Sequence, residues 1–184
     1  MPQKDRHSGN LSPEFALLGF LIAGPCHGYD LHLRFVSELG HIWHLSQSQA
    51  YAIFKRLEQH GDVKAKSVAQ EKLPARQMLH ITAHGRRRFD EWMEGISRNS
   101  RSIRLEFLTR LYFARIYKPE KVMCIYEVQC NEIKSEIDRL ETLLANLPPE
   151  QEFNQFSLDL RLRQMKLIQE WMRDIKAAII DSKE

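Results

Sequence analysis

Hydrophobic residues recur at helical spacing through the first sixty positions of the chain, in three consecutive stretches. The first stretch opens with Ser12 and Pro13, which are favoured at the N-cap and at the first position of a helix, and it stops at a Gly-Pro pair. The second spans residues 28–39 and the third spans residues 46–60, with a glycine directly after each. This pattern predicts three helices connected by short turns.

The pattern then changes to short runs that are typical of strands. Residues 63–69 and 77–81 are predicted to form two short strands that are joined by a polar turn. Thr82 follows as the N-cap of a fourth helix. The order helix, helix, helix, hairpin, helix predicts a winged helix-turn-helix domain over residues 11–97.

The last third of the chain, residues 102–184, is predicted to be helical throughout. One helix is expected over residues 104–117, a longer one from Pro119 to the Pro148 break, and a last one over residues 153–180. A lone helical hairpin cannot cover apolar stripes as wide as these, so we expect a homodimer in which a second copy covers them. Packing within the domain alone is the alternative. The predicted fold class is therefore mainly α with a small β-hairpin.

Basic side chains are concentrated in the middle of the chain. Residues 46–88 hold nine lysines and arginines against three acidic residues, whereas residues 101–184 hold 14 of each, and the whole chain carries a net charge of only +3. A local basic patch attracts phosphate backbones, so this distribution favours double-stranded DNA as a partner. An unevenly charged, solvated surface is the alternative.

The third predicted helix has the pattern of a helix that reads DNA. Its apolar stripe consists of Ala50, Ile53, Phe54 and Leu57. Polar side chains at the N-terminal end of such a helix can form hydrogen bonds with base edges and phosphates in the major groove. The alternative is an amphipathic helix with an ordinary polar face. The predicted DNA contacts of this helix are Gln47, Ser48, Gln49, Tyr51 and Lys55.

The predicted hairpin adds a second basic cluster next to this helix. A wing of this kind reaches the phosphate backbone or the minor groove. Three adjacent arginines, residues 86–88, follow on the fourth helix, where they cannot share one face, so one or two of them can reach phosphate. The predicted DNA contacts of the wing are Lys64, Lys66, Lys72 and Arg76.

Several short motifs in this order resemble the PadR family of transcriptional regulators. A leucine-rich helix that ends in a Gly-Pro pair and is followed by His27, Gly28 and Tyr29 is similar to the opening signature of that family. Other segments are similar to its recognition helix and wing, and the C-terminal region is similar to the larger PadR-type regulators. The resembling segments are residues 17–31, 45–61, 74–76 and 79–86.

The resemblance implies a homodimeric repressor that binds a palindromic operator and dimerises through an antiparallel helical domain over residues 102–184. Some members of the family release DNA when they bind small aromatic compounds such as phenolic acids. Aromatic side chains that are candidates to line such a pocket could equally pack in the core or at the dimer interface. These candidates are Trp43, Trp92, Phe156 and Trp171.

The His-Gly-Tyr triplet also has a structural interpretation that needs no ligand. His27 can cap the second helix, Gly28 permits close packing of the backbone, and Tyr29 can brace the first helix against the second. We therefore expect these three residues to serve as scaffold.

The chain carries no motif of an enzyme or a cofactor site. It has no glycine-rich phosphate loop, no GxSxG and no HExxH sequence. His80 and His84 are four residues apart, but the first belongs to a predicted strand and the second to the helix after it, and no cysteine is near them. We expect no catalytic residue, no metal site and no cofactor.

The apolar run over residues 15–23 is too short to span a membrane. Glu14 precedes this run, and Pro25 stands where a signal-cleavage site needs a small residue. The three cysteines form no CxxC motif, which fits a reducing compartment. We expect a cytoplasmic protein without a membrane partner. A protein-protein adaptor with a degenerate winged helix is the alternative function, and the basic segment argues against it.

Overall fold

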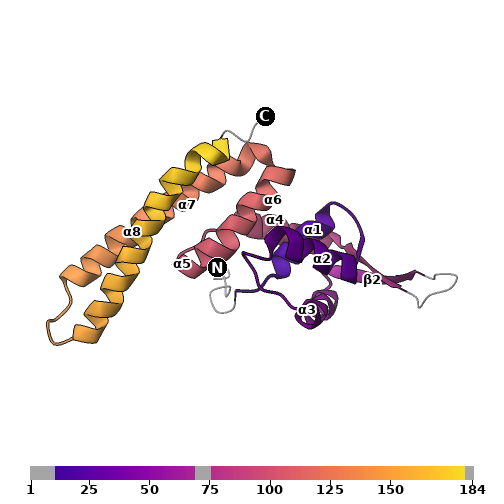
Figure 1. Cartoon of the computed structure of the whole chain (residues 1–184), viewed down its shortest axis with the longest axis horizontal. Coiled ribbons are helices and arrows are strands. Elements are labelled where there is room, and N and C mark those ends of the chain that lie inside the picture. The colour runs from indigo at the N-terminus through magenta and orange to yellow at the C-terminus, as the bar shows by residue number, and fades with distance from the viewer. Residues whose placement is uncertain (1–10, 69–75, 181–184) are drawn as a thin grey trace, which may run out of the picture. The chain divides into compact units, whose positions relative to one another are not determined.

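The computed structural model describes residues 11–68 and 76–180 of the chain (Figure 1). The chain divides into two compact units, with the boundary between Gly95 and Ile96. The first unit combines helices with a small sheet, and the second unit is helical in the residues that the structure describes. The protein is therefore mainly α with a small sheet, as predicted.

The first unit has the predicted winged helix-turn-helix fold. Its antiparallel sheet has the strand order β1-β3-β2. The sequence analysis missed β1, which pairs with Met78 and Leu79 of β3, because two residues are too few to show an alternating pattern. The elements of this unit are α1 (Glu14–Ile22), β1 (Cys26–His27), α2 (Gly28–Leu39), α3 (Gln47–Gln59), β2 (Val63–Val68), β3 (Arg76–Ile81) and α4 (Ala83–Met93).

The central helix of this unit is α1. Every residue from Phe15 to Leu21 is buried, because α2, α4 and β3 all contact this helix. That burial explains why its apolar side chains surround the helix and do not form a single stripe. The structure begins α1 at Glu14, and Pro13 is its N-cap, so the prediction of Ser12 as N-cap was wrong. The Ser12 hydroxyl instead accepts a hydrogen bond from Nη2 of Arg56 at 3.3 Å.

A buried junction joins the end of α3 to the starts of β2 and α4, and Asp62 lies at its centre. The side chain of Asp62 is fully buried. Its Oδ1 lies 3.0 Å from Nδ1 of His84, and its Oδ2 accepts a hydrogen bond from Arg88. Its backbone carbonyl accepts a hydrogen bond from the Thr82 amide at 2.9 Å. Gly85 permits this packing, because a Cβ atom there would lie 2.2 Å from the Asp62 carbonyl oxygen.

The predicted helix boundaries at this junction are confirmed. Gly61 ends α3 with a φ of +74°, a left-handed conformation that favours glycine. The Thr82 side chain caps α4 by accepting a hydrogen bond from the Gly85 amide at 3.0 Å. Both signals could be recognised in the sequence because each determines the backbone only a few residues away along the chain.

The second unit begins with a helix that is divided into parts. The sequence analysis predicted one helix over residues 104–117, whereas the structure has a short α5 (Ser100–Ser102), a π-helical turn η1 (Ile103–Phe107) and α6 (Leu108–Tyr117). The Thr109 hydroxyl of α6 donates a hydrogen bond to the carbonyl oxygen of Leu105 in this turn at 2.6 Å. The spacing of apolar residues does not reveal which hydrogen-bond pattern a helical turn adopts, so this division could not be predicted.

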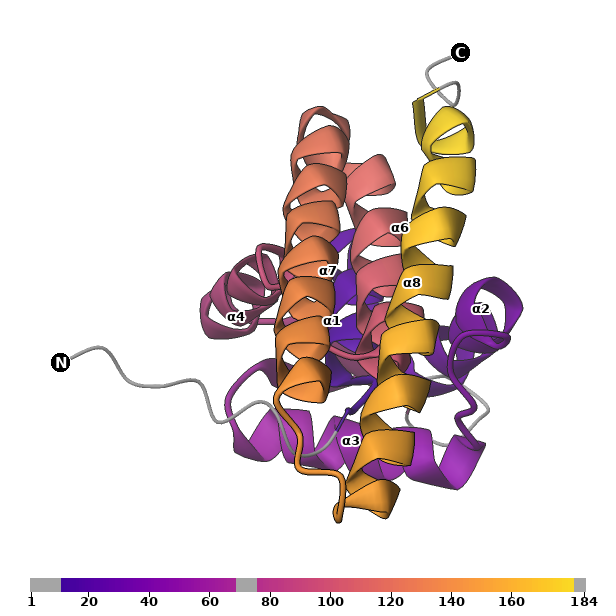
Figure 2. The ribbon, with the colours of Figure 1, turned by 90° about the vertical axis from the view of Figure 1, so that its left-hand side faces the viewer.

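A long antiparallel helical hairpin completes the second unit (Figure 2). A short 3-10 helix, η2 (Pro119–Lys121), leads into α7 (Val122–Ala145), and α8 (Glu152–Ile180) returns alongside it. The Tyr126 hydroxyl donates a hydrogen bond to the Met172 carbonyl oxygen at 2.7 Å and so joins the two helices. The buried apolar residues of the hairpin include Ile133, Ile137, Leu140, Leu162, Met165 and Met172.

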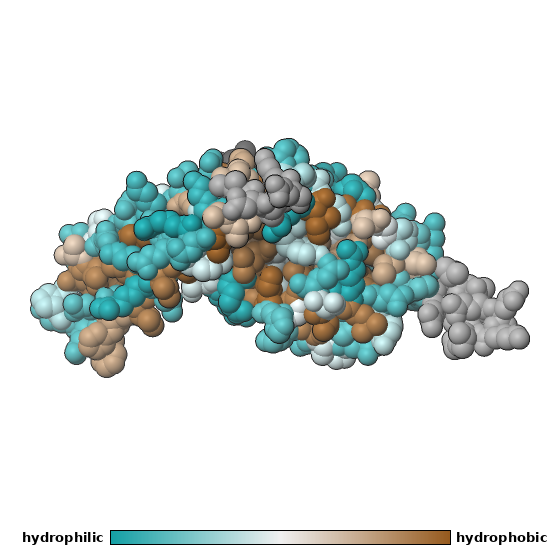
Figure 3. Space-filling view, turned by 45° about the horizontal axis from the view of Figure 1, so that its top comes forward, coloured by the Kyte–Doolittle hydropathy of each residue, from teal (hydrophilic) through white to brown (hydrophobic). Residues whose placement is uncertain are grey.

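The hairpin leaves a second apolar stripe in contact with solvent. Four large apolar side chains of α8 lie at positions separated by three, four and seven residues, which places them on one face of the helix. Figure 3 shows apolar side chains at the surface of the α7–α8 hairpin, at the left of the view. The exposed residues of the stripe are Phe153, Phe156, Leu160 and Leu167.

Among the described residues, no helix is both long and apolar enough to cross a membrane.

Candidate nucleic-acid interface

A capping box fixes the start of α3. The Ser46 hydroxyl accepts a hydrogen bond from the Gln49 amide at 3.3 Å, and the Gln49 side-chain oxygen accepts one from the Ser46 amide at 2.9 Å. The Ser48 hydroxyl lies 3.1 Å from the Ser46 hydroxyl. Two of the predicted DNA contacts, Ser48 and Gln49, therefore also hold the first turn of the helix in shape. The N-cap role of Ser46 that was predicted from the sequence is confirmed.

The exposed surface of α3 has two parts. A helix turns by about 100° per residue, so Ser48, Ala52 and Gln59 lie directly opposite the buried stripe, with Lys55 beside them. Tyr51 lies to one side of this row, next to the sheet. Ala52 and Gln59 were not among the residues predicted from the sequence, although the helical period places both opposite the buried stripe.

Two contacts outside the helix set its position. The Arg56 guanidinium forms an ion pair with Glu14 at the start of α1. Nε2 of His32 lies 2.9 Å from the carbonyl oxygen of Leu45, directly before the capping box. Arg56 and His32 were not among the predicted functional residues. Arg56 belongs to α3 and connects that helix to α1, whereas His32 belongs to α2 and contacts the segment that leads into α3.

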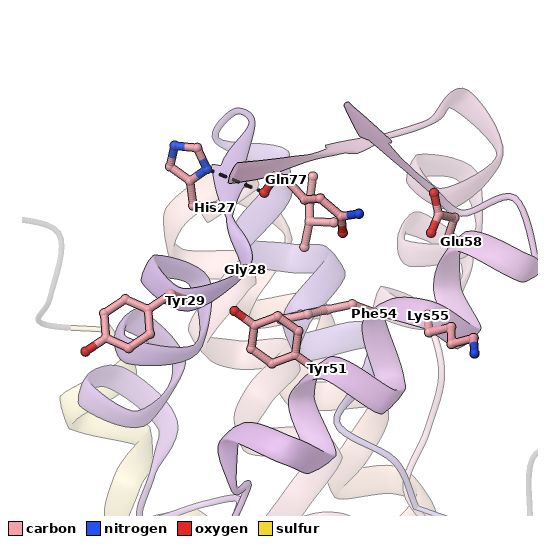
Figure 4. Close-up of a pocket in the computed structure, with 9 residues that line it drawn as sticks. His27, Gly28, Tyr29, Tyr51, Phe54, Lys55, Glu58 and Gln77 are labelled. Carbon is pink, nitrogen blue, oxygen red and sulfur yellow. Dashed lines mark hydrogen bonds between the residues drawn. The ribbon is translucent and has the colours of Figure 1, made fainter. Parts of the chain in front are cut away.

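A groove lies between α3 and the sheet (Figure 4). It has a volume of about 660 Å³, and residues of β1, α2, α3 and β3 line it. The rings of Tyr51 and Phe54 line it side by side, in an edge-to-face contact with centroids 5.5 Å apart. Gly28 makes room for both rings, because a Cβ atom there would lie 3.3 Å from Cε2 of Phe54 and 3.5 Å from Cε1 of Tyr51.

The groove changes the interpretation of the His-Gly-Tyr triplet. His27 is the N-cap residue of α2, but its side chain makes no capping hydrogen bond, and its Nδ1 lies 3.4 Å from the Gln77 carbonyl oxygen. Tyr29 is half-exposed and lines the groove, so about half of its surface faces solvent, and its predicted role in bracing α1 stays a prediction. The close packing that was predicted for Gly28 is present.

Comparison with known proteins decides what kind of domain carries this groove. Residues 17–91 match the model of the transcriptional regulator PadR-like family. This segment of the chain is therefore a PadR-like domain. The matched residues run from α1 to α4 and include the helix with the capping box and the neighbouring hairpin. The PadR-like family is a family of transcriptional regulators and not of enzymes.

Individual regulators are similar over most of the chain. The negative transcriptional regulator PadR of Bacillus subtilis is 24% identical over 140 residues, which are 74% of this chain and 77% of that protein. A crystal structure of B. subtilis PadR with operator DNA covers 90% of this chain and 98% of its own, with 24% identity and a TM-score of 0.46. The Vibrio cholerae virulence activator AphA covers 93% and 99%, with 19% identity and a TM-score of 0.40.

The PadR-like wing carries its lysines on the face that is turned away from α3. Lys64 pairs with His80 and Lys66 pairs with Met78, and directly opposed residues in an antiparallel ladder point to the same side. Ala65 and the buried Leu79 form the other side, which lines the groove and the core. Lys64 and Lys66 are exposed. Arg76 lies opposite Val68 at the start of β3, and Lys72 falls outside the described residues.

The four aromatic residues that were predicted to line a ligand pocket fall in both units. Trp43 is buried in the first unit, and Trp92 stacks on Phe15 with ring centroids 5.2 Å apart. Phe156 and Trp171 belong to α8 of the second unit, and Phe156 is 56% exposed. The residues that line the groove beside α3 are different ones. The aromatic ligand pocket that the sequence analysis proposed from these four residues therefore stays a prediction.

Two histidines of the first unit have protein partners. His84 contacts the carboxylate of Asp62, and His32 contacts a backbone carbonyl. Within residues 11–68 and 76–180, no group of three or more His, Cys, Asp and Glu side chains is placed to hold a metal ion.

Proposed function

We propose that this PadR-like regulator is a homodimeric repressor that binds a palindromic operator in double-stranded DNA in the cytoplasm and releases it when a small aromatic ligand binds. The observation that carries the proposal is the first turn of α3, which is capped, fully polar and exposed next to a basic hairpin. The repressor activity is inferred from the B. subtilis relative, which is a negative transcriptional regulator.

The proposed DNA contacts lie on α3 and on the hairpin. Exposed amide and hydroxyl groups in the first turn of α3 would meet base edges in the major groove. The basic residues of the hairpin would meet phosphates on its outer side. The proposed set is Gln47, Ser48, Gln49, Tyr51 and Lys55 on α3, and Lys64, Lys66, Lys72 and Arg76 on the wing.

The homodimer is supported by the exposed apolar stripe of α8. Large apolar side chains are rarely left in one continuous row on a monomer, so a second copy of the hairpin is the proposed cover. The proposed dimerisation domain spans residues 102–184, and the proposed DNA-binding domain spans residues 11–97. Two DNA-binding domains in a two-fold dimer would read the two halves of a palindrome.

The ligand is proposed by analogy with the same relative, since one of its crystal structures contains p-coumaric acid. Tryptophan fluorescence would report such binding if Trp43, Trp92 or Trp171 lies near the ligand. A titration with phenolic acids is expected to change the fluorescence and to weaken DNA binding at the same concentrations. If neither changes, the protein does not respond to this class of ligand.

The DNA-binding proposal is tested by selection of fragments from the genome that encodes the protein. The purified chain should enrich fragments with a two-fold symmetric sequence, and each should bind two copies of the chain. Gln47→Ala should alter which sequences are enriched, whereas Glu91→Gln, an exposed change on α4, should not. A protein that retains no fragment even at low salt would contradict the proposal.

A further inference from the structure

The groove between α3 and the sheet lies next to the surface of α3 that is proposed to read DNA, but its lining has a different chemistry. Its polar groups include the Tyr51 hydroxyl, the Lys55 amine and the Gln77 amide, which come from α3 and β3. Tyr29 and Tyr51 are about half-exposed, at 51% and 47%, so the groove is open along one side. Hydroxyl, amide and ammonium donors on an open surface suit an extended anionic chain.

Tyr51 is poorly placed to read bases. Its ring is held against Phe54 and against the backbone at Gly28, to one side of the row of α3 that lies opposite the core. A side chain that is fixed in this way cannot turn onto that row without losing the contact with Phe54. Gln77 belongs to the sheet, across the groove from Tyr51, and its side-chain amide points into the groove in Figure 4.

We propose that this groove seats the sugar-phosphate backbone of one DNA strand, with the Tyr51 hydroxyl and the Gln77 amide as phosphate contacts. The proposal rests on DNA binding by α3 as proposed above. It assigns Tyr51 to the backbone and leaves base reading to Gln47, Ser48 and their neighbours in the first turn. Gln77 becomes a DNA contact that the sequence analysis did not predict.

The charges in the groove fit a strand that lies at its tyrosine end. Glu58 is a carboxylate in the lining, and the backbone amide of Ala65 donates to its Oε1 at 3.4 Å. That contact holds the negative charge at the β2 end of the groove, away from Tyr51 and Gly28 (Figure 4). Lys55 supplies a cation on the same wall. A phosphate at the tyrosine end therefore meets neutral donors, whereas the Lys55 ammonium and the Glu58 carboxylate both lie toward the other end (Figure 4).

A small molecule would fit the groove less well than a strand. Its volume of about 660 Å³ lies within the range of ligand pockets, which is about 300–1,000 Å³. Such pockets enclose most of the surface of their ligand, whereas this groove has two half-exposed tyrosines on its rim. A DNA strand needs no enclosure, because its bases remain stacked in the duplex outside the groove.

The test combines two protein variants with chemically altered DNA. Tyr51→Phe keeps the ring against Phe54 and Gly28 and removes only the hydroxyl, and Gln77→Ala removes an exposed amide. Each is titrated against a selected duplex in which one phosphate at a time is replaced by a neutral methylphosphonate. We expect either variant to weaken binding to selected and to random duplexes by the same factor, about 3- to 10-fold, because a phosphate contact carries no sequence information.

The outcome depends on which methylphosphonate linkages are coupled to the two protein substitutions. At one linkage, or at two adjacent ones, the methylphosphonate should weaken the wild type but have little further effect on Tyr51→Phe and Gln77→Ala. Ser48→Ala is the matched control, since the Ser48 hydroxyl lies in the row of α3 that is opposite the buried stripe and not in the groove. Its effect should add to that of every methylphosphonate.

Four results would overturn the inference. Additive effects at every linkage, with normal binding by the wild type, would reject the groove as a backbone site and leave the DNA-binding proposal intact. A changed preference between operator sequences in Tyr51→Phe would make Tyr51 a base contact. Loss of affinity for a phenolic acid in Tyr51→Phe with unchanged DNA affinity would make the groove a ligand pocket. A wild type that binds no DNA would reject both proposals.

Discussion

Single residues with buried polar atoms connect the parts of the DNA-binding unit. Asp62 is the strongest example, because its fully buried carboxylate contacts His84 and Arg88 while its carbonyl receives the Thr82 amide. A buried carboxylate is tolerated only when hydrogen bonds satisfy it. The end of α3 and the start of α4 are therefore fixed to each other through one residue.

Asp62→Ala should lower the free energy of unfolding by about 1.5–3 kcal/mol, the usual contribution of a hydrogen bond to a charged group. The loss is limited because His84 and Arg88 are partly exposed and can return to water. Glu91→Gln, which removes one partner of an exposed ion pair, should change stability by less than about 0.5 kcal/mol. Urea denaturation measures both. Equal stability of Asp62→Ala and the wild type would show that the junction contributes nothing.

Tyr126 makes the second unit sensitive to high pH. Burial, together with a hydrogen bond to Cys130, raises the pKa of Tyr126 to about 12. A tyrosine in the unfolded chain has a pKa of about 10. The folded state therefore favours the neutral hydroxyl, and this contribution to stability is complete below about pH 10 and is lost as the pH rises through 12.

Tyr126→Phe should remove this pH dependence. At pH 9 the variant should be less stable than the wild type, because the hydrogen bond to the Met172 carbonyl is gone. Between pH 10 and 12 the wild type should lose stability faster than the variant, so the difference should shrink or reverse. Denaturation of both proteins at several pH values tests this. Parallel curves over that range would contradict the assignment to Tyr126.

At the scale of the elements, the features legible in the sequence are those that act over short stretches of chain. Caps and glycine stops predicted α3 and α4, and apolar periodicity predicted the buried stripe of α3. The strand β1 was missed because its two residues show no alternation and its partner lies some fifty residues away, so only the folded structure reveals the pairing. The orientation of Tyr51 was missed for the same reason, since it depends on Gly28 of another helix.

Strand register is the other property that the sequence left open. The alternation of side chains means that a shift of one residue would move Lys64 and Lys66 to the side that faces α3. The register places them on the outer face of the wing, away from Lys55 on α3. The two basic groups are therefore separate surfaces, although the sequence presents them as one basic segment.

This separation predicts independent contributions to DNA affinity. Lys55→Gln should reduce the slope of log affinity against log salt by about 0.9, and Lys64→Gln with Lys66→Gln should reduce it by about 1.8 if each lysine neutralises one phosphate. The triple variant should show the sum, because the two surfaces share no contact. Fluorescence anisotropy over a series of salt concentrations measures the slopes. An unchanged slope in the double variant would remove the wing lysines from the interface.

At the scale of the whole molecule, the proposed function depends on assembly. Each chain offers α3 as its proposed reading helix, and a palindrome presents two half-sites. The exposed stripe of α8 is the surface on which the proposed dimer rests. Its members Phe153, Leu160 and Leu167 follow one another at intervals of seven residues, the spacing of a seam between packed helices.

Replacement of Leu160 and Leu167 by glutamate should convert the dimer to a monomer, because buried carboxylates would face each other across the seam. Binding to the full palindrome should fall sharply, while binding to an isolated half-site should change little. Val36→Glu is the control, since Val36 is also exposed and apolar but lies on α2. Light scattering gives the mass of each variant. A dimer that survives both substitutions would place the seam elsewhere.

The two-residue strand β1 has a consequence for how the wing moves. It makes β3 an inner strand, with β1 along one side and β2 along the other at Met78 and Leu79. Because β1 runs directly into the first turn of α2, a fluctuation that opens the wing must also pull on that helix. Amide hydrogens of β3 and of the first turn of α2 should then exchange with solvent deuterium at a common rate, as one cooperative unit. Duplex DNA should slow both together.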